Sequence, residues 1–105
     1  MKVSVIVPVY NSSMMLKELC KRIFNTMNKL NLKNDFELIM INDSSYDDSW
    51  DKICELTKNY NFILGINLKE NFGQHNVMLT KSGLNTHLEK VKIAILQYLL
   101  MKIWG

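Results

Sequence analysis

Side chains that can bind a nucleotide follow two short apolar segments of the chain. Tyr10 and Asn11 come directly after residues 3–9, and Asp43 comes directly after residues 36–42. Both segments resemble buried parallel strands, whose carboxyl ends meet at the edge of an α/β sheet where ligands bind. A tyrosine ring can lie against a nucleobase, and a carboxylate can accept a hydrogen bond from a uracil N–H or a ribose hydroxyl. The two segments therefore indicate a nucleotide site.

Each of these residues also has a purely structural interpretation. Tyr10 could pack on its own loop, and Asp43 could form a helix-capping Asx turn helped by Ser44 and Ser45. Asp47 and Asp48 are interpreted as partners of a helix N-terminus rather than as a metal-binding pair. Both alternatives for Tyr10 and Asp43 remain open from these residues alone.

A third polar segment spans residues 71–75, Asn-Phe-Gly-Gln-His. Gly73 permits a positive φ or a close approach of the backbone to a ligand. The pattern of Val77, Met78 and Leu79 predicts a helix just beyond it, whose N-terminus would favour a phosphate. His75 could bind phosphate or act as an acid or base, but a structural hydrogen bond is the favoured interpretation.

The elements that position these residues follow from the apolar pattern. Residues 3–9, 36–42 and 62–67 are predicted strands, the first of them buried on both faces. Apolar residues three and four apart predict a helix after Ser12 or Ser13, one of which would cap it. Ser45 and Asp48 resemble a capping box for a second helix. The expected order is β-α-β-α-β-α with right-handed crossovers and strands arranged 3-2-1.

The segment from residue 81 onward is ambiguous. Within residues 90–97, Val91, Ile93 and Ile95 alternate with other residues as in a strand, whereas Leu88, Val91, Ile95 and Leu99 would share one face of a helix. Strong helix formers from residue 96 to 102 favour the helix.

Composition limits the class of protein. The 105 residues suffice for one domain, and 48% hydrophobic residues with a net charge of +3 are ordinary for a globular protein and argue against a nucleic-acid footprint. Cys20 and Cys54 lie at apolar helix positions and are expected to be free thiols in a reducing cytosol. Residues 1–3 lack the pattern of a signal peptide, and the apolar run at 93–101 is too short for a bilayer span. A cytoplasmic protein is expected.

Three blocks of the sequence, in this order, resemble family 2 glycosyltransferases of the GT-A fold. They are residues 5–11 (Val-Ile-Val-Pro-Val-Tyr-Asn), residues 41–45 (Ile-Asn-Asp-Ser-Ser) with Asp47, and residues 71–75. The last block is similar to the polyprenyl-phosphate branch, whose members transfer a sugar from a nucleotide donor to a lipid phosphate at the membrane. The resemblance covers residues 3 to about 80. It implies a Rossmann-like, three-layer α/β sandwich with a parallel sheet, here a truncated GT-A domain.

The resemblance also implies a site for a nucleotide sugar, expected to be linked to uridine diphosphate. No catalytic residue and no metal ligand carries over. By resemblance the nucleotide-binding residues fall into three groups: Pro8, Tyr10 and Asn11 along the base pocket, Asp43 and Ser44 at the uracil or ribose, and Asn71, Gly73 and Gln74 near the ribose and diphosphate. Family members often have an acidic residue soon after the Tyr-Asn pair, where Ser12 and Ser13 stand here.

The larger departure from the family is a missing Asp-x-Asp motif, which holds Mg or Mn on the donor diphosphate. No Asp follows Asp51 in this chain. We therefore expect residues 1–105 to form a single truncated nucleotide-sugar-binding domain, family-like over 3–80 and divergent over 81–105, without the acceptor half or membrane anchor. We hypothesise that a reading frame lost after about Leu79 accounts for the divergent segment.

Two functions follow from these expectations. One is nucleotide-sugar binding for transfer to a lipid-phosphate acceptor. The alternative is a catalytically inactive remnant or a dimeric interaction module. Because a bare edge is expected beside the first strand, and exposed edges invite pairing, a homodimer is predicted. Since the family's acceptor is a lipid phosphate, association with the membrane is also expected.

Overall fold

The chain forms alternating strands and helices followed by a hairpin. The computed structural model describes residues 3–71, 74–80, 93, 95–98 and 100–101. The elements, in chain order, are β1 (Val3–Val9), α1 (Ser13–Lys29), β2 (Phe36–Asp43), α2 (Ser49–Asn59), β3 (Ile63–Asn71) and β4 (Gln74–Thr80).

The four strands form one sheet in the order β1-β2-β3-β4. β1 and β3 both run parallel to β2, with Val9 opposite Asn42 and Asp43 opposite Leu68, whereas β4 is antiparallel to β3. The predicted parallel arrangement of the first three strands is confirmed. Because β1 and β2 end in register, Tyr10 and Asp43 follow at the same edge of the sheet.

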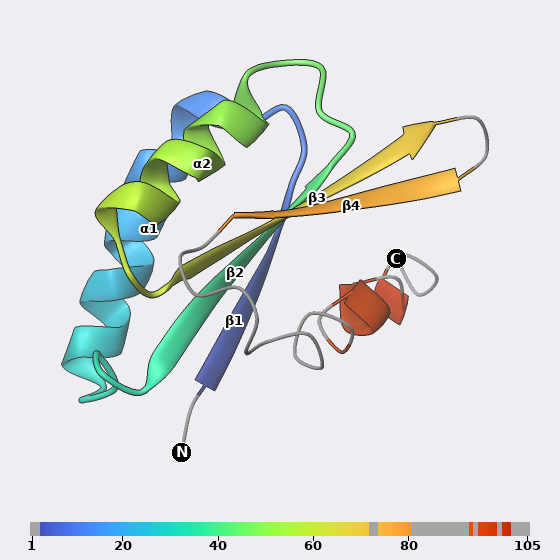
Figure 1. Ribbon diagram of the computed structural model, residues 1–105. Helices are drawn as coiled ribbons and strands as arrows, with labels where there is room; N and C mark the ends of the chain where they lie inside the picture. The colour runs from blue at the N-terminus through green and yellow to red at the C-terminus, as the bar shows by residue number, and fades with distance from the viewer. Residues whose placement is uncertain (1–2, 72–73, 81–92, 94, 99, 102–105) are drawn as a thin grey trace.

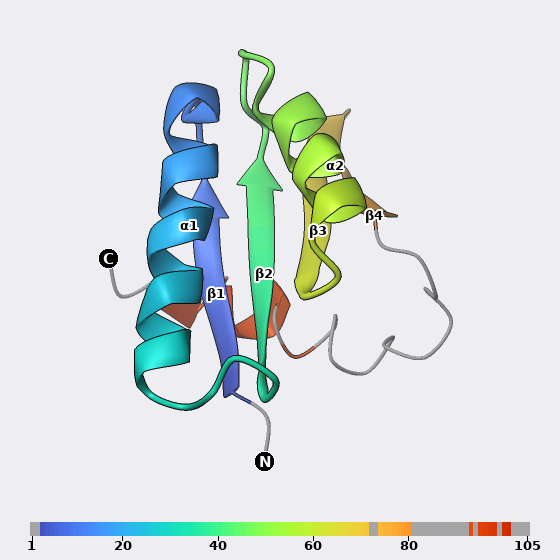
Figure 2. The same ribbon diagram turned by 90° about the vertical axis from the view of Figure 1, so that its left-hand side faces the viewer.

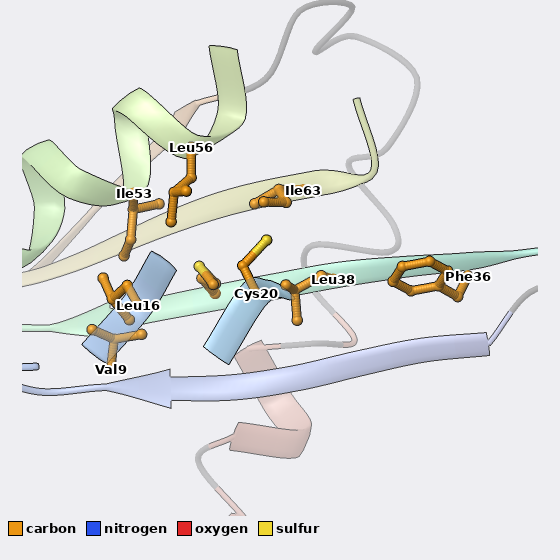
Figure 3. Packing of buried hydrophobic residues seen from close by; sticks show 9 residues of the cluster. Val9, Leu16, Cys20, Phe36, Leu38, Ile53, Leu56 and Ile63 are labelled. Atoms are coloured by element: carbon orange, nitrogen blue, oxygen red, sulfur yellow. The ribbon is translucent and has the colours of Figure 1, made fainter. Parts of the chain in front are cut away.

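Helices α1 and α2 cover the same face of the sheet (Figures 1 and 2). Two right-handed crossovers that progress in one direction place their helices on one side, which explains this arrangement. The predicted apolar stripe of α1 buries Leu16 and Cys20, and that of α2 buries Ile53 and Leu56. Figure 3 shows these side chains packed on the strands. The buried members of this cluster are Val9, Leu16, Cys20, Phe36, Leu38, Met40, Ile53, Leu56 and Ile63.

A short helical stretch near the C-terminal end of the chain covers the opposite face (Figures 1 and 2). Residues 95–98 are helical, as are residues 93, 100 and 101, so the helix favoured from sequence is confirmed for these positions. Tyr98 is buried and Ile95 is half-buried against the sheet. The sheet residues of this second cluster are Ile39, Ile41, Leu64, Ile66 and Leu68, with Ile6 at its margin. The C-terminal stretch thus supplies the third layer of the sandwich.

The predicted helix after residue 76 is wrong. Residues 74–80 form β4, and β3 extends to Asn71 instead of ending at residue 67. Three consecutive apolar residues fit a strand as well as a helix. The antiparallel pairing satisfies main-chain groups along the edge of β3, which a helix would leave without partners in the sheet.

The expectation that β1 is buried on both faces is also wrong. Only Val9 is buried in this strand. In the described part of the sheet β1 is an edge strand, so β2 is its one neighbouring strand and its other edge has no strand beside it. The apolar composition of residues 3–9 predicted the strand but not its place in the sheet.

Both cysteines are free, as expected, but their environments differ. Cys20 is buried, and burial raises the pKa of its thiol to about 11. Cys54 is only half-buried.

We predict that a thiol-specific reagent at about pH 8 modifies Cys54 rapidly and Cys20 slowly, because the thiolate is the reactive species. Colorimetric titration with Ellman's reagent measures both rates. The Cys54→Ser variant should react only slowly until denaturant is added. Equal rates for the two thiols would contradict the buried position of Cys20.

Candidate functional site

The loops after β1 and β2 are joined through the main chain and side chain of Asn11. The Asn11 N–H donates to Ser45 Oγ at 3.0 Å, and Asn11 Oδ1 accepts from the N–H groups of Tyr46 at 2.7 Å and Asp47 at 3.3 Å. Asn11 has a φ of 47°, in the left-handed region that asparagine tolerates better than most residues. Its side chain thus fixes the loop after β2 relative to the loop after β1.

A buried polar chain continues from this junction into the sheet. The Ser45 hydroxyl donates to Asn42 Oδ1, and Asn42 Nδ2 donates to Asn67 Oδ1 at 2.9 Å. Asn42 and Asn67 are opposite each other on β2 and β3, and both are buried. Since buried amides cost stability unless they are hydrogen-bonded, this chain ties the loop conformation to the register of the sheet.

Asp47 connects the N-termini of both helices. Its Oδ1 accepts from the Ser49 N–H at 2.9 Å and from the Ser49 hydroxyl, and its Oδ2 accepts from the Ser13 N–H at 3.3 Å. Ser49 and Ser13 are the first residues of α2 and α1. The hydroxyl of Ser49, with the two main-chain donors, holds the pKa of Asp47 below its usual value. The interpretation of Asp47 as a partner of a helix N-terminus is confirmed, and a second helix shares it.

The predicted capping residues play different roles. Ser12 is the N-cap of α1, but its side chain makes no capping bond; its hydroxyl donates to the Tyr10 carbonyl at 2.7 Å instead. The capping box of Ser45 and Asp48 is wrong, because α2 begins at Ser49 and Asp48 makes no side-chain cap. Asp47 already satisfies the first N–H of each helix, which removes the need for a local cap.

Two aromatic rings lie at this edge. Tyr10 and Tyr46 are 56% and 89% exposed, and their ring centroids are 6.4 Å apart in an edge-to-face arrangement at 77°. The Tyr10 ring is thus exposed and meets the ring of Tyr46 from the loop after β2, and its binding role stays a prediction. Tyr46 was missed from the sequence, although its position directly after the block at residues 41–45 was a usable signal.

Asp43 lies at the end of β2, half-buried, with a partner from far along the chain. The Tyr98 hydroxyl donates to Asp43 Oδ2 at 2.7 Å. Burial, and then the hydrogen bond and negative charge of Asp43, raise the pKa of Tyr98. Ser44 has a φ of 56° and donates to the Leu68 carbonyl from its N–H at 3.1 Å and its hydroxyl at 3.3 Å. The sequence offered no signal for the contact of Tyr98.

The other predicted site residues that the structure describes lie on strands of the sheet. Pro8 is exposed on β1, opposite Ile41. Asn71 and Gln74 are paired at the end of the β3–β4 hairpin, and Gly73 lies outside the described residues. Because residues 74–80 form a strand, the helix N-terminus that was expected to favour a phosphate here is replaced by a hairpin.

The described side chains do not form a ready-made cluster of cation ligands. Within the described part of the chain, no three His, Cys, Asp or Glu residues lie close enough to hold a metal ion. Both oxygens of Asp47 already accept main-chain hydrogen bonds. A Mg or Mn ion here would therefore take most of its oxygen ligands from the donor diphosphate and water, with at most one or two carboxylates from the described residues.

A cavity of about 580 Å³ lies at the opposite end of the sheet. Both helices end there, at the C-caps Leu30 and Tyr60. The cavity is lined by Phe24, Lys33, Asn34, Thr57, Lys58, Asn59, Tyr60, Asn61 and Phe62.

Fold and edge together define an α/β domain that gathers polar and aromatic side chains at the carboxyl ends of its parallel strands, the edge at which such sheets bind ligands. The sequence model of glycosyl transferase family 2 matches residues 4–80. The chain belongs to this family.

Two curated relatives carry more specific names. A dolichol-phosphate mannosyltransferase of Pyrococcus furiosus is 43% identical over 60 residues, which are 57% of this chain and 16% of the relative. An undecaprenyl-phosphate 4-deoxy-4-formamido-L-arabinose transferase of Proteus mirabilis is 36% identical over 80 residues, 74% of this chain and 24% of the relative. The matched segment therefore spans about a quarter or less of each relative. Among the residues that the structure describes, no helix is both long and apolar enough to cross a bilayer.

The bridging role of Asp47 predicts a pH-dependent loss of stability. Because its pKa is lowered in the folded state, the unfolded chain binds more protons below about pH 4, and the contribution of Asp47 is lost as pH falls through the folded pKa. We predict that Asp47→Asn lowers the thermal midpoint at neutral pH and that the difference from wild type shrinks below about pH 4.

The matched control is Asp48→Asn, since Asp48 makes no side-chain cap. Thermal unfolding followed by circular dichroism between neutral pH and about pH 3 measures all three proteins. A midpoint for Asp47→Asn equal to that of Asp48→Asn at every pH would contradict the bridge.

Proposed function

We propose that this chain binds a nucleoside diphosphate sugar, linked to uridine, at the carboxyl edge of its sheet. It would serve as the donor-recognition part of a glycosyl transferase whose acceptor is a lipid phosphate at the membrane. The observation that carries the proposal is the junction of the two loops through Asn11, which brings Tyr10 and the end of β2 to one edge. The relatives' names, which mention dolichol phosphate and undecaprenyl phosphate, support the acceptor class.

The proposed contacts follow the chemistry of each group. The exposed ring of Tyr10 gives a nucleobase an apolar surface, and Tyr46 adds a second ring beside it. Asp43 and Ser44 would contact the uracil or ribose. The rest of the proposed set comprises Pro8 and Asn11 near the base and Asn71, Gly73 and Gln74 toward the diphosphate.

In the family reaction, an acceptor oxygen attacks the anomeric carbon of the sugar while the nucleoside diphosphate leaves. A bound cation would supply charge stabilisation for that leaving group. The described residues do not provide its ligands, and no Asp follows Asp51 in the sequence. These observations favour, as a second candidate, a chain that recognises the nucleotide without completing transfer.

Calorimetric titration with uridine diphosphate tests the site directly. We predict weak binding that changes little when manganese is added, because the loops lack a set of cation ligands. Tyr10→Ala should lower the affinity about threefold to tenfold, the range for loss of an aromatic contact. Tyr60→Ala, at the other end of the sheet, serves as the control.

Absence of binding to the wild-type chain would overturn the proposal. A large gain in affinity with manganese would instead indicate that other carboxylates of the chain, or carboxylates rearranged by the ligand, hold the ion.

We further propose a second copy of this chain as a partner. Four apolar residues of the C-terminal helical stretch remain between 46% and 58% exposed in the single chain: Ile93, Leu96, Leu100 and Met101. The inner residues of the stretch pack on the second face of the sheet, because α1 and α2 share the first face and leave the second available. The outer residues still favour association.

Light scattering after size-exclusion chromatography should give the mass of a dimer for the wild type. The double variant Leu96→Glu, Leu100→Glu should be monomeric, because it places charges on the outer side of the stretch. The matched control is Lys17→Glu with Lys21→Glu on exposed positions of α1, which should remain dimeric. A monomeric wild type would contradict this partner.

A further inference from the structure

The contact between Tyr98 and Asp43 joins the C-terminal helical stretch to the proposed nucleotide site. Tyr98 Oη lies 2.7 Å from Asp43 Oδ2, across 55 residues of sequence. At this distance a hydroxyl that donates to a carboxylate forms a charge-assisted hydrogen bond, which is stronger than a neutral one. The contact therefore adds a strong polar interaction to the apolar packing of Tyr98.

The direction from which Tyr98 arrives is informative. Side chains alternate along a strand, so Asp43 shares a face of β2 with Ile39 and Ile41. Tyr98 is buried in the cluster on that same face, which α1 and α2 do not cover. Tyr98 is 6% exposed as a residue, whereas Asp43 is only partly buried at the edge of the sheet. The tyrosine thus reaches Asp43 from the apolar cluster on this face, and Asp43 as a residue is only partly buried.

The Tyr98 hydroxyl stays a hydrogen-bond donor at neutral and mildly alkaline pH. Burial and the neighbouring carboxylate raise the pKa of Tyr98, so its proton remains in place at neutral and mildly alkaline pH. The buried ring has little freedom, because Leu64, Ile66 and Leu68 belong to the same cluster. A rigid ring with a fixed donor can hold the carboxylate in one orientation.

We propose that Tyr98 is a positioning residue of the nucleotide site: its hydroxyl orients the Asp43 carboxylate so that Asp43 accepts a hydrogen bond from the uracil or ribose. This inference rests on the proposed function. It assigns the divergent C-terminal stretch a part in recognition of the nucleoside, through Asp43 and without direct contact with the ligand.

Tyr98→Phe tests the inference, because it removes the hydroxyl and retains the ring in the apolar cluster. We expect its affinity for uridine diphosphate to fall about tenfold, as for a lost hydrogen bond to a charged group. Tyr60→Phe removes a tyrosine hydroxyl at the opposite end of the sheet and should bind as the wild type does. Circular dichroism checks that both variants are folded at the temperature of the titration.

A double-mutant cycle separates positioning from a general structural effect. If Tyr98 acts through Asp43, Tyr98→Phe should lower the affinity in the wild-type background and have no further effect in the Asp43→Asn background. An equal loss in both backgrounds would overturn the inference. Unchanged or tighter binding by Tyr98→Phe would also overturn it while leaving the proposed function intact.

An NMR experiment on the wild-type chain tests the inference without relying on the folding of Tyr98→Phe. With tyrosines labelled at the ring carbon that carries the hydroxyl, saturation with uridine diphosphate should shift the Tyr98 NMR signal and leave that of Tyr60 unmoved. A Tyr98 signal that does not move at saturation would overturn the inference. A wild-type chain that binds no uridine diphosphate in the titration would overturn the proposed function and this inference together.

Discussion

The carboxyl edge of the sheet depends on satisfying the main-chain N–H groups where two buried strands turn into two helices. The first N–H groups of a helix have no partner within it. Asp47 accepts from the first residues of α1 and α2, and Asn11 accepts from Tyr46 and Asp47 in the loop before α2. One carboxylate and one amide therefore fix both loops and both helices relative to each other, and the exposed rings of Tyr10 and Tyr46 take their positions from this junction.

The two faces of the sheet connect to that edge in different ways. On the first face, Leu16 of α1 and Ile53 of α2 pack against the strands and set the directions in which the helices leave the edge (Figure 3). On the second face, Tyr98 packs on β2 and β3 and ends in a hydrogen bond with Asp43. The apolar cores on both faces thus end in polar contacts at the same edge, so packing and the arrangement of the site are coupled there.

Most of the strands and helices could be predicted from the sequence, because the patterns that indicate them are local. Apolar runs followed by polar residues indicated β1 and β2, and apolar residues three and four apart indicated α1 and α2. The helix expected after residue 76 was wrong because the apolar residues Val77, Met78 and Leu79 fit either structure, and pairing with β3 decided between them. Two contacts of the site could not be predicted from local sequence patterns. Asp47 binds Ser13, 34 positions away, and Tyr98 binds Asp43, 55 positions away.

The position of Asp47 also bears on which part of a nucleotide this edge can recognise. A helix N-terminus attracts an anion because its N–H groups and partial positive charge face outward. Here the carboxylate of Asp47 occupies that position for both α1 and α2 and is favoured in its charged form. A diphosphate placed at the same N–H groups would meet a negative charge and lack donors. The groups that remain at the edge, the rings of Tyr10 and Tyr46 and the oriented carboxylate of Asp43, are suited to a base and a ribose. This edge therefore offers more to a nucleoside than to its phosphates, and in the part of the chain that the structure describes no three acidic, His or Cys side chains gather to hold a cation.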